Sequence, residues 1–184
     1  MGARDDSLAG HLLVAAPALQ DPNFRRAVVL LIEHESEGAV GVVLNRPSEH
    51  DAEAALPELA PILGEGERLH EGGPVQVEAV IALAEYEEPA EAQTIVGPVG
   101  VLTGDVDVAE LPRLVRRARV FLGYAGWGPG QLETELGEEA WFVEPARPGD
   151  VFDASPEDLW RRVLERKGGA FRLVARMPED PTLN

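Results

Sequence analysis

Short apolar runs alternate with clusters of Gly, Pro and charged residues along most of the chain. Runs rich in Val, Ile and Leu that are bounded by turn residues are typical of β-strands. The pattern predicts strands at His11–Ala16, Ala27–His34, Ala39–Asn45, Val75–Ala84, Thr94–Leu102, Arg119–Trp127, Trp141–Glu144 and Phe171–Arg176. The second and third runs are joined by the short loop Glu35–Gly38, whose glycine can adopt a positive φ, so we expect an antiparallel hairpin there.

A helical pattern, with apolar positions three or four residues apart, occurs in fewer places. The first spans residues 108–118, where one face is apolar and the opposite face holds Arg113, Arg116 and Arg117. The apolar positions are Val108, Leu111, Leu114, Val115 and Ala118. This spacing predicts a short amphipathic helix.

A second helix is predicted near the C-terminus. Ser155 is a candidate N-cap because Pro156 follows it, and the pair Gly168-Gly169 would end the helix. The apolar stripe between these signals consists of Leu159, Trp160, Val163 and Leu164. A third helix is expected around Asp51–Leu59, interrupted by Pro57.

The segment Arg119–Ala140 is predicted to form a strand, a glycine turn and a helix, with the run Gly123–Leu132 at its centre. A glycine-rich turn that enters a helix exposes backbone N–H groups and can hold an anion. The run matches neither G-x-G-x-x-G nor G-x-x-x-x-G-K-[ST]. Glu133 and Glu135 already place negative charge in the first helical turn. We therefore favour a packing role, with a ligand pocket as the alternative.

Composition favours one globular domain over residues 1–184. Of these 184 residues, 45% are hydrophobic, and no apolar run approaches the ~18 residues of a membrane-spanning helix. The ends, residues 1–8 and 178–184, are expected to be flexible or extended. Met1–Ser7 lacks the apolar segment of a secretory signal, which favours a cytoplasmic location. Because cysteine is absent, disulfides, thiolate catalysis and cysteine-ligated zinc are excluded.

The formal net charge is −17. Because affinity for nucleic acids comes largely from cationic contacts with phosphates, this charge argues against direct nucleic-acid binding. It also repels anionic membrane surfaces, so no membrane partner is expected. The one dense basic run, Arg113–Arg119, is interpreted as a solvated face paired with nearby carboxylates, and a minimal phosphate-contacting stripe is the alternative. No helix-turn-helix spacing accompanies it.

Five ordered motifs carry a resemblance to a known family. They are Gly10–Pro17, Asp21–Phe24, Gly38–Pro47, Gly72–Val75 and Gly123–Leu132. In this order they resemble the AlgH/YqgE family along residues 10–164. The resemblance implies a single compact α+β domain, with mixed, mostly antiparallel sheets forming a pseudo-barrel and flanking helices. The family carries the name of a transcriptional regulator and has no agreed biochemical activity. The end of the chain, Met177–Asn184, departs from the commoner family ending.

These motifs also supply a candidate ligand site. Arg46 is a planar, always charged group suited to a carboxylate or phosphate, although an internal Asp or Glu is the favoured partner. If the motif turns converge with nearby aromatic residues, they would line a pocket with a few oriented polar groups. The candidate binding residues are Asn45, Arg46, Gly72, Gly73, Tyr124, Trp127 and Gln131.

Other chemistry receives less support. The histidines, His11, His34, His50 and His70, form no helical i, i+4 pair, so no metal site is predicted and each is interpreted as a solvated or core residue. None of the serines lies in G-x-S-x-G. Lys167 is expected in a last helical turn, where its charge suits the helix dipole. No cofactor is predicted and no catalytic residue is assigned.

Three hypotheses for function follow. The favoured one is a non-enzymatic regulatory or binding domain that acts through a protein partner or a small ligand. The second is an enzyme of unknown reaction that uses Asn45, Arg46 and the Gly123–Gln131 region. The third is a direct DNA-binding regulator, which the net charge disfavours. The sequence leaves the ligand, the pathway and the oligomeric state open.

Overall fold

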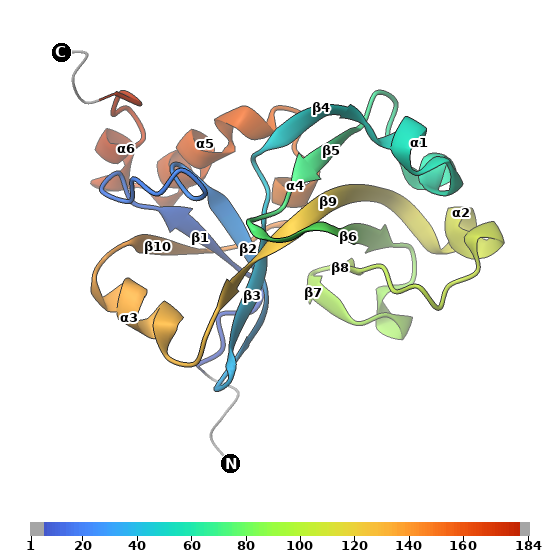
Figure 1. The fold of residues 1–184 in the computed structure, drawn as a ribbon, viewed down its shortest axis with the longest axis horizontal. Coiled ribbons are helices and arrows are strands. Elements are labelled where there is room, and N and C mark those ends of the chain that lie inside the picture. The colour runs from blue at the N-terminus through green and yellow to red at the C-terminus, as the bar shows by residue number, and fades with distance from the viewer. Residues whose placement is uncertain (1–5, 181–184) are drawn as a thin grey trace.

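One ten-stranded sheet forms the centre of the molecule (Figure 1). The computed structural model describes residues 6–180. Its strands are β1 (His11–Ala15), β2 (Val28–Glu35), β3 (Gly38–Val43), β4 (Pro47–Asp51), β5 (Arg68–Glu71), β6 (Val75–Tyr86), β7 (Thr94–Val96), β8 (Val99–Val101), β9 (Val115–Trp127) and β10 (Trp141–Pro145). The main path runs β10–β1–β2–β3–β9–β6–β8–β7, with antiparallel neighbours throughout, and β5 joins β4 to β9. The predicted mixed α+β class and single domain are confirmed.

Strand β9 links the two halves of the sheet. Its C-terminal end pairs with β3, where Ala39 lies opposite Trp127. The rest of β9 pairs with β6 on one side and, in parallel, with β5 on the other, where His70 lies opposite Phe121. Figure 1 shows β9 as a long bent strand that crosses the middle of the molecule. The predicted strand at Arg119–Trp127 is therefore present, but it begins earlier, at Val115.

The strands β1 and β2 are buried on both faces. Leu12 and Leu30 are paired across the two strands and belong to one core cluster, whereas Leu13 and Val29, the next pair, belong to another. Successive side chains of a strand point to opposite faces, so continuous apolar runs are what a doubly covered sheet requires. Helix α5 (Leu159–Lys167) covers the first face, and Trp160 donates its indole N–H to the Ala15 carbonyl at 2.9 Å.

The helices are short. They are α1 (Ala52–Ala55), α2 (Leu111–Leu114), α3 (Gln131–Gly137), α4 (Pro148–Val151), α5 and α6 (Phe171–Val174), with the 3₁₀ turns η1 (Pro57–Ile62), η2 (Pro89–Glu91), η3 (Val108–Glu110) and η4 (Pro156–Asp158). Over residues 6–180, none of them has both the length and the apolar character needed to cross a bilayer. The predicted helix at Asp51–Leu59 is confirmed as α1 followed by η1, with the break at Pro57.

The prediction of a strand at Phe171–Arg176 is wrong, because this segment contains helix α6. The chain turns through Gly168 and Gly169, both at positive φ, and then packs back along α5. Phe171 meets Phe142 of β10 edge to face, with ring centroids 4.9 Å apart. Its short apolar run resembles a strand, but no strand of the described residues is paired with it.

The helix predicted over residues 108–118 is also too long. Helix α2 ends at Leu114, and β9 begins at Val115, so Arg116 and Arg117 lie on a strand rather than on a helical face. Pairing decides this boundary, because Arg117 is in register with Glu85 of β6. The long-range ladder therefore overrides the local helical pattern.

Two smaller corrections concern turns. The single strand predicted at Thr94–Leu102 is a hairpin, β7 and β8, which turns at Gly97 with φ 51°. Ser155 does precede the C-terminal helical segment, but its side chain makes no capping hydrogen bond there. The hairpin expected at Gly38 between β2 and β3 is confirmed.

The predicted flexible ends fall partly outside the described residues, which exclude 1–5 and 181–184. At the N-terminal side, Ser7 donates to the His34 carbonyl, and the Leu8 N–H donates to Nδ1 of His34 at 3.0 Å. At the C-terminal side, the carbonyl of Glu179 accepts a hydrogen bond from the Arg25 guanidinium. The described parts of both ends are therefore attached to the body of the fold.

Candidate functional site

A cavity of about 400 Å³ lies where the links β3–β4 and β5–β6 meet β9. Its polar lining consists of Asn23, Arg46, Ser48, His50, His70 and Glu71. Its apolar lining consists of Val43, Pro74, Val77 and Leu122, together with Gly73. The cavity combines one guanidinium, one carboxylate and an aliphatic wall, and its volume is within the usual range for small-molecule sites.

Backbone contacts build the wall between β5 and β6. The N–H of Gly72 donates to the Leu122 carbonyl at 2.7 Å, and the Gly72 carbonyl accepts from the N–H of Val43 at 2.8 Å. Gly73 has φ 152°, and a Cβ atom there would lie 2.2 Å from the carbonyl carbon of Tyr124. Only glycine allows this approach of the β5–β6 link to β9.

Arg46 is held by backbone carbonyls. Its Nη1 donates to the Pro22 carbonyl and its Nη2 to the Arg25 carbonyl, both at 2.9 Å. The expected partner was a carboxylate, but both of these hydrogen bonds of Arg46 go to carbonyls. The charges of Glu71 and Asp21 raise the pKa of Arg46, whereas burial has the larger effect and lowers this pKa. A guanidinium has five N–H donors, so three have no partner within residues 6–180.

Asn45 stabilises the loop that holds Arg46. Its amide donates to the Arg26 carbonyl at 2.8 Å and accepts from the N–H of Val28 at 2.9 Å. Arg26 has φ 54°, an uncommon conformation for a residue other than glycine. Asn45 does not line the cavity, but it fixes the backbone that presents the two carbonyls to Arg46.

His70 forms part of the cavity wall and is only 2% exposed. Its Nδ1 lies 3.0 Å from the Arg68 carbonyl and must carry the proton, because a carbonyl only accepts. Burial, together with the positive charge of Arg119, lowers the pKa of His70 to about 4, so the ring is neutral near pH 7. Its Nε2 is then a buried acceptor with no hydrogen-bond partner among the described residues.

The aromatic residues of the predicted site lie elsewhere. Trp127 is 6% exposed and packs against Phe24 and Trp141. Its indole N–H donates to Glu135 at 2.8 Å, and Gln131 also donates to that carboxylate, at 3.2 Å. The Gly123–Leu132 run thus ends in an aromatic cluster closed by helix α3.

Of the seven candidate residues, the structure places Arg46 and Gly73 in the lining of the cavity, with Gly72 directly behind it. Tyr124 of β9 lies opposite Val75 of β6. Its side chain packs against the core and does not line the cavity. Sequence reasoning missed the other polar residues of the lining, which are Asn23, Ser48, His50, His70 and Glu71. The available signal was that His70 and Glu71 directly precede the Gly72-Gly73 motif.

A second cavity of about 400 Å³ shares His70 with the first and is lined by Arg68, Arg117 and Arg119. Each of these arginines already has a carboxylate partner: Glu157, Glu85 and Glu67, respectively. The arginines Arg113 and Arg116 of the predicted basic face are likewise paired, with Glu110 and Glu87. Within residues 6–180, no group of three or more metal-ligating side chains is placed to hold a metal ion.

Comparison with known proteins shows similarity to one protein family. A family model described as AlgH-like matches residues 12–172. A UPF0301 protein of Streptomyces avermitilis is 48% identical over 97% of this chain and 96% of its own length, and one of Thermobifida fusca is 45% identical with the same coverage. The crystal structure of a Corynebacterium diphtheriae protein matches with a TM-score of 0.85 and 30% identity, over 96% of this chain and 95% of that one. The solution structure of the AlgH protein from Pseudomonas aeruginosa matches with a TM-score of 0.69 and 31% identity, over 97% and 98% of the two chains.

Proposed function

This chain belongs to the AlgH-like family, and we propose that it is a binding domain that takes a small ligand in the cavity between Arg46 and Gly73. Family membership confirms the resemblance carried by the five ordered motifs. Two of those motifs, Gly38–Pro47 and Gly72–Val75, both supply residues to the lining of the cavity.

The proposal rests on polar groups at the cavity that lack hydrogen-bond partners. Arg46 is fixed by two carbonyls, and its other three N–H donors have no partner within residues 6–180. Nε2 of His70 is a buried acceptor that also lacks a partner in this part of the chain. Unpaired polar groups beside a cavity are costly unless a ligand or water satisfies them. The aliphatic side chains of Val43, Val77 and Leu122 add apolar surface for a ligand.

Direct DNA binding is not part of the proposal. Arg113, Arg116 and Arg117 are each paired with a glutamate, so they offer little unneutralised charge to phosphates. The net charge of −17 opposes the same contact.

Thermal-shift measurements with a panel of small polar molecules test the proposal. The panel contains amino acids, nucleosides, sugar phosphates and dicarboxylates. A compound that binds the native state raises the unfolding midpoint. Val77 is 62% exposed at the rim, so Val77→Trp is expected to block the cavity and abolish the shift. Val80 is 52% exposed on the same strand but does not line the cavity, so Val80→Trp should retain the shift.

The proposal is wrong if no compound in the panel raises the midpoint. It is also wrong if the shifts survive Val77→Trp as fully as they survive Val80→Trp, because the ligand would then bind elsewhere.

A further inference from the structure

We infer that the cavity takes a zwitterion with adjacent carboxylate and ammonium groups, that is, a free α-amino acid. This inference rests on the proposed function and adds the chemical class of the ligand. It follows from the placement of one positive and one negative side chain in the lining of the cavity, Arg46 and Glu71.

Arg46 provides the site for the carboxylate. Both of its hydrogen bonds go to backbone carbonyls, which orient the guanidinium without neutralising its charge. The side chain is half-buried, so its charge is less screened than that of a surface arginine. Charge-assisted hydrogen bonds from a fixed guanidinium are the strong contacts for a carboxylate.

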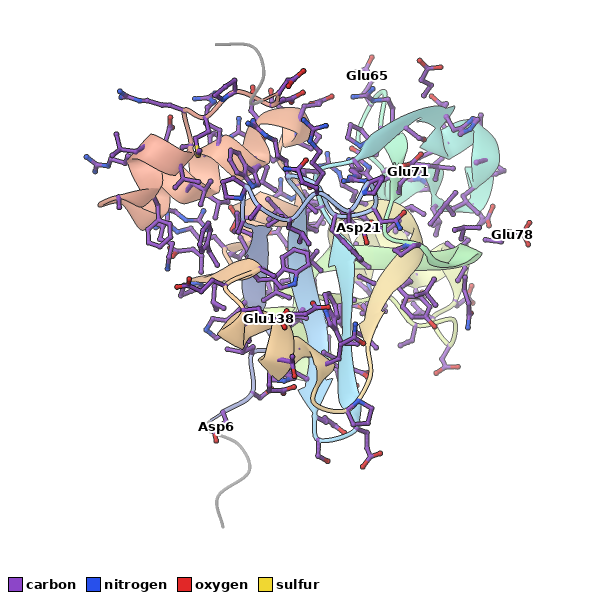
Figure 2. All side chains as sticks on the ribbon, turned by 60° about the vertical axis from the view of Figure 1, so that its left-hand side comes forward. Asp6, Asp21, Glu65, Glu71, Glu78 and Glu138 are labelled. Carbon is purple, nitrogen blue, oxygen red and sulfur yellow. The ribbon has the colours of Figure 1, made fainter. Side chains whose placement is uncertain are left out.

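Glu71 provides the site for the ammonium group. Its backbone N–H donates to the Arg46 carbonyl at 2.8 Å, so the two residues are fixed next to each other. Its exposed carboxylate makes no hydrogen bond or ion pair with any residue of the described chain. The negative charge of Asp21 also acts on Arg46 and raises its pKa, as that of Glu71 does. Figure 2 shows Glu71 and Asp21 near the upper end of the sheet.

The charges around Arg46 favour a zwitterionic ligand over an anionic or a cationic one. The charges of two carboxylates, Glu71 and Asp21, both act on the one guanidinium of Arg46, in a chain of net charge −17. A ligand with only negative groups is repelled by that field, and a ligand with only an amine leaves Arg46 unsatisfied. A zwitterion satisfies both side chains at once.

The remaining walls fit the rest of an amino acid. Val43, Val77 and Leu122 offer an aliphatic surface to a side chain. His70 forms part of the same lining. A volume of about 400 Å³ exceeds that of a single residue, so a medium or large side chain can be accommodated.

Isothermal titration calorimetry on the full chain tests this inference. The probes are the twenty amino acids and, for leucine, two analogues that each lack one charge: 4-methylpentanoate, without the ammonium group, and 3-methylbutylamine, without the carboxylate. At least one amino acid should bind. If leucine binds, each analogue should bind at least about tenfold more weakly, because a charged group is then left unpaired.

The variant Glu71→Gln separates the two halves of the site. It should weaken amino-acid binding at least about tenfold and leave the weak binding of the carboxylate analogue unchanged or improved. Glu78 is an exposed residue of β6 that lies outside the cavity lining (Figure 2), so Glu78→Gln should bind as the wild type does.

These experiments distinguish failure of the amino-acid inference from failure of the proposed binding function. If another class of compound binds and Val77→Trp blocks it, while no amino acid binds, the inference is overturned and the binding domain remains. If an amino acid binds but Glu71→Gln has no effect, the assignment of the ammonium site is overturned. If no compound binds, both proposals fall.

Discussion

The carboxylate of Glu135 holds two tryptophans together, and removing it should have a large effect on stability. Its Oε2 accepts the indole N–H of Trp127 at 2.8 Å and that of Trp141 at 2.9 Å. The two side chains are 6% and 4% exposed, and they belong to strands β9 and β10. Glu135 of helix α3 thus joins two strands that are not neighbours in the sheet.

The magnitude follows from these two bonds. A hydrogen bond to a charged group contributes about 1.5–3 kcal/mol, and a buried donor left unpaired loses a similar amount. Glu135→Leu removes the acceptor for both indoles and should lower the free energy of unfolding by about 3–5 kcal/mol. Glu135→Gln keeps an oxygen that can accept both bonds without the charge, so its loss should be about 1–2 kcal/mol.

Urea unfolding followed by tryptophan fluorescence and by circular dichroism measures both variants. Glu138 follows the same helix, its side chain has no partner within the described residues, and it is exposed (Figure 2), so Glu138→Leu is the matched control with a change below about 0.5 kcal/mol. The reasoning is refuted if Glu135→Leu and Glu135→Gln lose the same free energy, or if Glu135→Leu is as stable as the control.

Three further substitutions test other parts of the structure. Gly73→Ala should lose at least about 2 kcal/mol in chemical denaturation, because its φ is 152° and a Cβ would lie 2.2 Å from the Tyr124 carbonyl carbon. His70 stabilises the fold above its unfolded pKa of about 6.5 and loses this contribution as the pH falls towards 4, because burial lowers its pKa to about 4 in the native state. The difference in unfolding free energy between wild type and His70→Gln should therefore shrink by about 3 kcal/mol across this pH range. Arg119→Met should lose about 3–5 kcal/mol in denaturation, since the largely buried Glu67 carboxylate then has no guanidinium partner.

Each of these substitutions has a control in the same chain. Gly104→Ala places a methyl group where no atom lies within 4 Å, so it should be nearly neutral. His50→Gln changes an exposed histidine and should change the free energy of unfolding little. Arg113 is paired with Glu110 but has 80% of its side chain exposed, so Arg113→Met should cost little. Equal effects in a variant and its control would contradict the corresponding structural explanation.

The fold could be predicted where local sequence and tertiary environment agree. Val28–Leu31 is apolar throughout and is buried on both faces, so a strand was the consistent interpretation. Phe171–Arg176 was predicted wrongly because a short apolar run fits a strand and a short helix equally well. The contact between Phe171 and Phe142, which is distant in sequence, decides between them.

The candidate site was predictable only in part for the same reason. Arg46 and Gly73 could be found because they lie in short motifs whose backbone chemistry is visible locally. The place of His70 next to the Gly72-Gly73 motif was visible in the sequence, but its position in the cavity was not. That position depends on the pairing of Pro47 with His70 and of His70 with Phe121. The free Nε2 and the low pKa of His70 arise from burial by these distant strands, which no local pattern encodes.

Strand β9 also has a consequence for synthesis of the chain on the ribosome. Its partners β3, β5 and β6 all precede it in sequence and are translated first. The hairpins β2–β3 and β4–β5 can close early, but the strand edges that β9 will cover stay open until residue 127 has emerged. Open strand edges are the sites at which nascent chains associate wrongly. Between translation of β6 and completion of β9, these edges are therefore exposed to wrong pairing.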